Sequence, residues 1–216
     1  MDIQYVELLD KRMIEDIVNS NRFDYIDLGL PSRTLWATQN IGASSPSDYG
    51  LYFQWGDIVG YAKDQVGKDK QFTWEDYKWN PSGDGKIFTK YTTYGDKLEL
   101  EDDAANVNMG GSWHIPSPKQ FKELINNTTT RWTIFNDVSG MSFTSKKDNS
   151  KSIFIPASGR AWRGSVTSRN FEGCYWSSVT DLNYVDCVLC LNFFSGYSNI
   201  ISYNRSNGYS VRGVIG

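Results

Sequence analysis

The sequence predicts an α+β fold with two main helices, short antiparallel sheets and long ordered loops. Helical spacing marks a few segments, whereas the region after residue 140 consists of short alternating segments bounded by Gly, Ser or Asn. The aromatic content of 15% and the 19 glycines are typical of a compact, loop-rich domain. No apolar run approaches the roughly 18 residues that span a bilayer, so membrane insertion is not expected.

Residues 1–24 are predicted to form a helical extension that precedes one domain over residues 25–216. Apolar residues recur at helical spacing within residues 6–19: Leu8, Leu9, Met13, Ile14 and Ile17. The segment is too acidic and too interrupted for a signal peptide.

The first half of the domain is predicted to contain a hairpin, long loops and two helices. Residues 25–42 alternate around a turn at Gly29–Ser32 and predict the hairpin, and residues 44–85 predict loops held by aromatic side chains. Residues 99–108 predict a short helix closed by glycines. Ser117 and Gln120 form a capping box that begins a helix from Pro118 to about residue 126.

Short strands are predicted near residues 141–146, 152–157, 173–179, 185–194 and 208–215. In the fourth of these, alternate side chains point to opposite faces. We expect one face to belong to the core, with Leu189, Leu191 and Phe193. We expect the other to be exposed to solvent, with Cys190, Asn192 and Phe194.

The last 40 residues, 177–216, contain no Lys, Glu, Gln, Met or Trp, although the first 176 residues contain 38 of them. An even distribution would place about seven in this tail. None of these five residue types has a codon that ends in a pyrimidine. An Asn codon, AAC or AAT, whose adenines are replaced at random can encode many residue types but never these five. The tail therefore has the composition of former Asn codons with randomised adenines; depletion through β propensity is the alternative.

Several motifs along the chain, most of them before this tail, resemble one family. They are YIDLGLPS (25–32), LWAT (35–38), DYGLYFQWGD (48–57), DDAA (102–105), GGSWHIPS (110–117), IPASGR (155–160), GCYWSS (173–178) and GYSVRGV (208–214). In this order they are similar to a gut Bacteroides and phage group of domains with a C-type lectin fold of the formylglycine-generating-enzyme type. Some of that group are variable proteins of diversity-generating retroelements, in which adenine mutagenesis rewrites a C-terminal repeat. Arg33 stands where the family usually has Gly, His114 where Arg is frequent and Cys174 where an aromatic residue is common.

The resemblance implies a variable region at about residues 174–207, and implies that five aromatic residues belong to the scaffold: Trp36, Trp55, Trp113, Tyr175 and Trp176. The predicted ligand contacts are Val179, Thr180, Asp181, Leu182, Tyr184, Asp186, Cys190, Asn192, Phe194, Tyr197, Asn199, Ile200, Ile201, Tyr203 and Ser206. The expected ligand is a protein or glycan on a cell surface, bound from a virion or a bacterial surface. The chain has a formal charge of −3, so nucleic acid is not an expected partner. A monomer is favoured, and the oligomeric state stays open.

An enzyme is not expected, and neither a cofactor nor a metal site is predicted. Cys187 and Cys190 form a C-x-x-C within a strand, where the two side chains point to opposite faces. The single histidine, His114, is interpreted as structural, and calcium binding near Asp102 is left open. Two alternatives remain: an invariant adhesin-like surface domain, and a relative of the formylglycine-generating oxidases.

Overall fold

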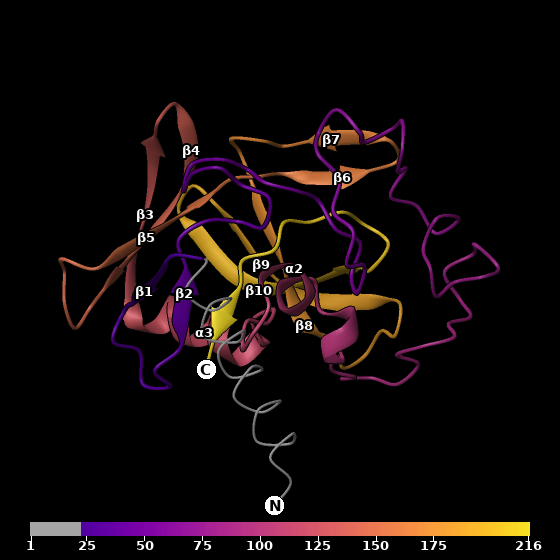
Figure 1. Ribbon diagram of the computed structural model, residues 1–216, viewed down its shortest axis with the longest axis horizontal. Coiled ribbons are helices and arrows are strands. Elements are labelled where there is room, and N and C mark those ends of the chain that lie inside the picture. Colours follow the sequence, from indigo (N-terminus) through magenta and orange to yellow (C-terminus); the bar gives the residue numbers. More distant parts are fainter. Residues whose placement is uncertain (1–22) are drawn as a thin grey trace, which may run out of the picture.

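The computed structural model describes residues 23–216 and is mostly β-sheet (Figure 1). Of the described residues, 36% lie in strands or bridges and 10% in helices. The predicted α+β class with two main helices is therefore wrong. The helix predicted for residues 99–108 is divided into the 3-10 turn η1 (Leu100–Asp102) and the six-residue α2 (Ala104–Met109) because Asp103, between them, has extended backbone. The helix expected over residues 6–19 lies outside the described residues.

The helix α3 (Pro118–Asn127) begins as predicted. Ser117 accepts a hydrogen bond from the Gln120 backbone, and the Gln120 side chain accepts one from the Ser117 backbone. This capping box fixes the first turn, and α3 then buries Phe121 and Leu124.

The central sheet consists of β8 (Gly173–Thr180), β9 (Cys187–Phe194) and β10 (Tyr197–Asn204) in the order β10-β9-β8. Both strand pairs are antiparallel, and β10 forms one edge of the sheet. The first two strands were predicted. Strand β10 was not, because its Ser and Asn residues weaken the alternation of polar and apolar side chains.

Two further three-stranded sheets and a hairpin surround it. The predicted hairpin is confirmed as β1 (Tyr25–Asp27) and β2 (Leu35–Ala37). The remaining strands are β3 (Thr128–Phe135), β4 (Val138–Ser145), β5 (Ser152–Pro156), β6 (Arg160–Trp162), β7 (Ser165–Thr167) and β11 (Val214–Ile215). Of the strand expected over residues 208–215, only β11 forms. The rest of that segment makes isolated bridges to three different parts of the chain.

Two hydrophobic clusters cover the two faces of the central sheet. On one face, Cys174 and Trp176 of β8 and Val188 and Cys190 of β9 pack with Tyr209. The opposite face contributes Tyr175, Leu191 and Phe193 to a cluster that also contains residues of α3, β2 and β4. Strand β9 is therefore packed from both sides.

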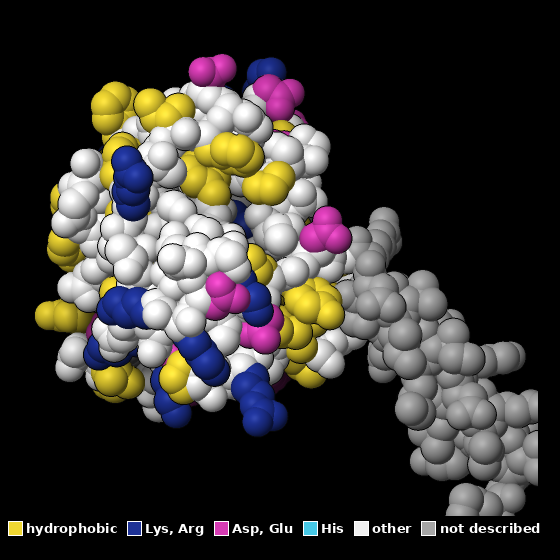
Figure 2. All heavy atoms as spheres, turned by 90° about the vertical axis from the view of Figure 1, so that its left-hand side faces the viewer, with side chains coloured by type: hydrophobic (Ala, Val, Ile, Leu, Met, Phe, Trp, Pro, Cys, Tyr) yellow, Lys and Arg dark blue, Asp and Glu magenta, His cyan; other side chains and the backbone are white. Residues whose placement is uncertain are grey.

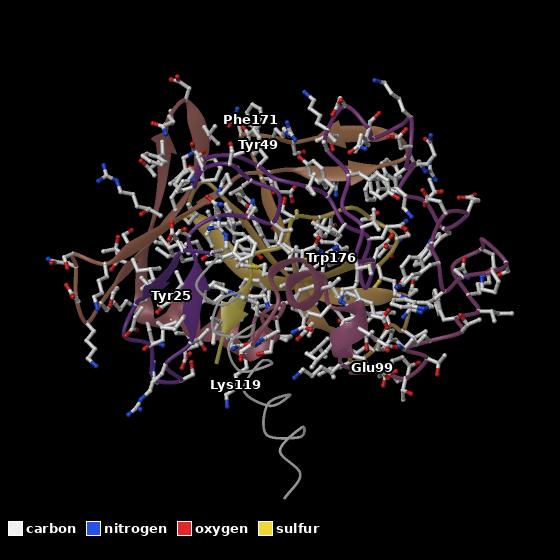
Figure 3. The ribbon with its side chains drawn as sticks, in the orientation of Figure 1. Tyr25, Tyr49, Glu99, Lys119, Phe171 and Trp176 are labelled. Atoms are coloured by element: carbon white, nitrogen blue, oxygen red, sulfur yellow. The ribbon has the colours of Figure 1, made fainter. Side chains whose placement is uncertain are left out.

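The five predicted scaffold aromatics are all buried: Trp36, Trp55, Trp113, Tyr175 and Trp176. Trp176 lies in the middle of the molecule (Figure 3) and stacks on Tyr209 with ring centroids 4.2 Å apart. Its indole N–H donates to the Phe53 carbonyl at 2.7 Å, and the Trp55 indole donates to the Ser177 carbonyl at 2.8 Å. These two bonds join the loop around residue 54 to β8 in both directions.

Trp176→Ala should lower the free energy of unfolding by roughly 3–5 kcal/mol, because a large buried ring and its hydrogen bond are lost together. The matched control is Tyr184→Ser, since Tyr184 is 63% exposed and should change stability by only about 0.5 kcal/mol. Chemical denaturation of both variants measures the difference. Equal losses would mean that the tail is ordinary core.

Candidate ligand-binding surface

The structure divides the predicted contact residues into accessible and buried sets. Leu182, Tyr184, Phe194 and Asn199 are exposed. Partly exposed residues are Val179, Asp186, Tyr197, Ile200, Ile201 and Tyr203. Buried residues are Thr180, Asp181, Cys190, Asn192 and Ser206.

The expectation that Cys190 and Asn192 are exposed is wrong. The alternation along β9 is present, but the side of the sheet that was expected to face solvent carries a hydrophobic cluster of its own. Cys190 is fully buried there with Trp176, and the Asn192 amide donates to the Glu172 carboxylate at 2.7 Å. Only the end of this row, Phe194, reaches the surface, at 44% exposure.

Thr180, Asp181 and Ser206 are also structural rather than exposed. The Thr180 hydroxyl donates to the Thr93 carbonyl, and the Ser206 carbonyl accepts from the Gln54 side chain. The Asp181 carboxylate accepts hydrogen bonds from the backbone of Asn183 and Tyr184 at 2.7 and 3.0 Å. Asp181 therefore shapes a tight turn, and its neighbours project outward.

The accessible residues lie along the outer part of the sheet. On β10, alternate residues Tyr197, Asn199, Ile201 and Tyr203 share one face. Phe194 of β9 stacks on Tyr197 at one end, with centroids 4.6 Å apart. We call these five residues, together with Leu182 and Tyr184, the edge surface.

The turn of Leu182 and Tyr184 is held near the other end of β10. The Arg205 backbone, just after β10, donates to the Asp186 carbonyl, and Cys187 pairs with Asn204. The eight residues of β10 extend over about 23 Å. The edge surface therefore runs the length of one strand, from an aromatic pair to an exposed turn.

A groove of about 270 Å³ opens beside β10. Arg160 and Trp162 of β6 form one side, and the other lining residues are Cys187, Ser202, Tyr203, Asn204 and Asn207. Arg160 and Trp162 were not predicted as contacts because they precede the tail with the unusual composition. Arg160 ends the motif IPASGR, but that motif indicated only the scaffold.

Arg205 marks where the accessible part of the tail ends. Its side chain is fully buried, with the guanidinium carbon 3.5 Å from the Phe88 ring centroid and a hydrogen bond to the Tyr91 carbonyl. Burial lowers the pKa of this guanidinium. The contact fastens the long loop around residues 77–91 to the central sheet, so Arg205 acts in packing.

The cysteines lack the arrangement of a reactive pair. Cys187 is partly exposed and Cys190 is buried, and all three cysteines are free. Burial raises the pKa of Cys187 to about 12 and raises that of Cys190 well above its ordinary value. A thiol with a raised pKa is a poor nucleophile at neutral pH. His114 contacts the Ser112 carbonyl and Gln120.

The acidic cluster Glu99, Glu101 and Asp102 has an internal cation. The Lys90 ammonium lies 2.6, 3.0 and 2.6 Å from their three carboxylates and so occupies the place that a bound cation would take. Asp103 points elsewhere and caps α2 by accepting from the Ala105 and Asn106 backbone. Asp102 and Asp103 therefore do not share one site, as calcium binding would require.

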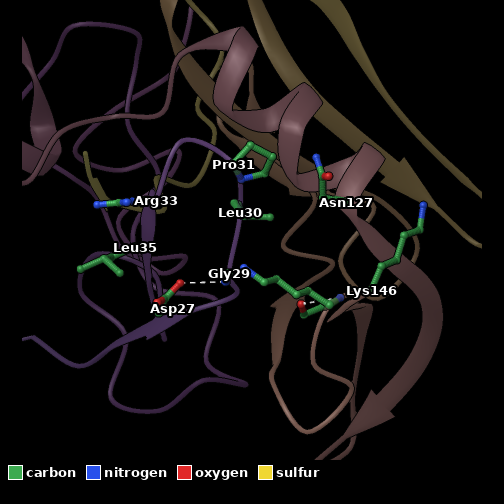
Figure 4. Close-up of a pocket in the computed structure, with 10 residues that line it drawn as sticks. Asp27, Gly29, Leu30, Pro31, Arg33, Leu35, Asn127 and Lys146 are labelled. Carbon is green, nitrogen blue, oxygen red and sulfur yellow. Dashed lines mark hydrogen bonds between the residues drawn. The ribbon is translucent and has the colours of Figure 1, made fainter.

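The rest of the described surface offers no comparable row of tail residues. A larger hollow of about 670 Å³ lies beside Leu30 and Asn127 (Figure 4), but none of its lining residues belongs to the tail. Arg33, at its rim, has a φ of 61°, which explains why Gly suits this turn.

The end of the molecule formed by β3 to β5 shows separate apolar groups with Lys and Arg between them (Figure 2). Within residues 23–216, no helix is long and apolar enough to cross a membrane.

Comparisons with known proteins give no relative: no protein-family model, curated protein or solved structure matches the chain.

The raised pKa values predict slow thiol chemistry. At pH 8 almost no Cys187 thiolate is present if its pKa is about 12, so a disulfide reagent should modify the native chain slowly. The rate should rise about tenfold per pH unit up to that pKa, because the thiolate fraction does. The absorbance of the thiol released from the reagent measures the modification rate, with the denatured chain as the control. Rapid modification of native Cys187 at pH 7 would contradict the prediction.

Proposed function

We propose that this chain is a ligand-binding protein, not an enzyme, whose C-terminal segment is rewritten by a diversity-generating retroelement. One observation carries the proposal. The segment without Lys, Glu, Gln, Met and Trp, residues 177–216, is also the segment that supplies all seven residues of the edge surface. The unusual composition comes from the sequence alone, and the structure adds that this segment forms the edge strand β10 and an exposed turn.

The physical properties of the edge surface suit variation. Residues of β10 are partly or fully exposed along its whole length. New side chains at Tyr197 and Asn199 can enter solvent without displacing the core, whereas Ile201 and Tyr203 also pack against the first cluster. Tyr and Phe add apolar contact area at low entropic cost, and Ser and Asn add adaptable hydrogen bonds, as in antibody loops. Asn codons with randomised adenines can encode all four of these residue types.

The ligand that we propose is a protein or glycan on a cell surface, bound by a chain carried on a virion or a bacterial surface. Exposed aromatic residues support a macromolecular ligand, since Tyr184 and Phe194 are 63% and 44% exposed and rings of this kind usually anchor interfaces. The ordered motifs along the chain support the retroelement class through their resemblance to its variable proteins.

The alternative is an invariant adhesin-like surface domain that uses the same edge surface without diversification. The oxidase alternative is weaker, because Cys187 and Cys190 have raised pKa values and Cys190 is inaccessible. A reactive pair needs an accessible thiolate.

The DNA beside the gene tests the proposal. We expect a non-coding copy of the segment that differs almost only at adenines, and a reverse transcriptase gene nearby. The copy should contain Asn codons at accessible positions: Leu182, Tyr184, Phe194, Tyr197, Ile201 and Tyr203. It should not contain them at the buried positions Val188, Leu191 and Phe193, where most substitutions would damage the core.

Sequencing a few kilobases on each side of the gene is sufficient. The absence of both the copy and the reverse transcriptase would leave the invariant adhesin-like domain as the better account. A copy with Asn codons mainly at the buried positions would contradict the role of the edge surface, although not the existence of the retroelement.

A further inference from the structure

We propose that the groove beside β10 binds an acidic side chain of an extended peptide segment, with Arg160 as its fixed anchor. The inference rests on the proposed ligand-binding function and adds the class of ligand. Arg160 lies outside the rewritten tail, so every variant of the edge surface would retain it.

The guanidinium of Arg160 makes no hydrogen bond or ion pair with any residue that the structure describes. Its Nε atom is buried and makes no hydrogen bond, and no ion pair reaches it from any residue in the range 23–216. The Glu172 carboxylate bonds to Asn192 instead. The terminal nitrogens are not among the buried unpaired atoms, and they can donate charge-assisted hydrogen bonds to a ligand carboxylate in the groove.

Aromatic rings flank this cation. The guanidinium carbon lies 6.0 Å from the Tyr203 ring centroid, and Trp162, 46% exposed, lines the same groove. The volume of about 270 Å³ suits one side chain rather than a whole small ligand. The groove thus combines one cation, two rings and room for an Asp or Glu side chain.

The adjacent strand edge favours a peptide over an acidic sugar. Strand β10 pairs with β9 on one side, and its other side has no strand among the described residues. The Ile200 N–H donates to its neighbour Asn199 rather than to β9, which places it on the outer side. Because antiparallel bonding alternates, Ser198 and Ser202 also direct main-chain groups outward. An extended peptide can add to such an edge, with Ser202 adjoining the groove.

The experiment is selection from a phage-displayed library of short random peptides on the folded full-length chain. Three variants are compared with the original: Arg160→Gln, Arg163→Gln and Ile201→Ser. Arg163 is the matched control, since it stacks on Trp162 on the same hairpin but does not line the groove. Circular dichroism and denaturation confirm that each variant is folded.

We expect peptides selected on the original chain and on Arg163→Gln to share an Asp or Glu. Arg160→Gln should weaken these peptides roughly 10- to 100-fold, the loss expected for charge-assisted hydrogen bonds. Bound peptide should slow hydrogen exchange of the Ile200 and Ser202 amides. Ile201→Ser should change the other selected positions and keep the acidic one.

Three outcomes would overturn the inference: no acidic residue in the selected pool, unchanged affinity for Arg160→Gln, or binding of free glucuronic or sialic acid in place of peptides. If Ile201→Ser changes the selected pool while Arg160→Gln has no effect, only this inference fails. If no substitution alters binding, the proposed function of the edge surface fails as well.

Discussion

The packing of β9 on both faces is the constraint on which the rest of the structure depends. Tyr209 and Trp176 close one side, and Leu191 and Phe193 extend into the second cluster on the other. The central strand is buried from Cys190 to Phe193, and exposure is concentrated at its ends, on β10 and in the turn before β9. The same constraint limits substitution, because a strand buried on both sides tolerates few changes of side-chain volume.

Local signals in the sequence were sufficient for individual elements. Ser117 and Gln120 identified the start of α3, and the β1–β2 hairpin followed from alternation around a turn. Alternation in β9 gave the correct two rows. It could not show that the row of Cys190 also faces a cluster, because Tyr209, Trp55 and Trp113, distant in sequence, cover that side. The fold class was wrong because the helix expected over residues 99–108 is divided at Asp103, and because strands such as β10 depend on their partner strand more than on their own composition.

Composition located the candidate site in the tail, and the structure changed which residues belong to that site. The tail supplied the exposed turn and β10, whereas Asp181 became a turn-forming residue and Arg160 entered from outside the tail. Arg205 marks the end of the accessible part of the tail. Its guanidinium packs on the Phe88 ring and holds a loop more than a hundred residues earlier in the chain. Composition indicates where residue types are restricted but not which side chains reach solvent.

The turn between β9 and β10 consists of Ser195 and Gly196, and Gly196 has a φ of 79°. This short connection fixes the register in which Phe194 meets Tyr197. One inserted or deleted residue would shift β10 by one position and exchange its two rows, turning Ile201 and Tyr203 away from the first cluster. The surface can therefore accept new residues but not new lengths. Under the proposed diversification, variation on this strand would have to come from substitution alone, unlike antibody loops, which also vary in size.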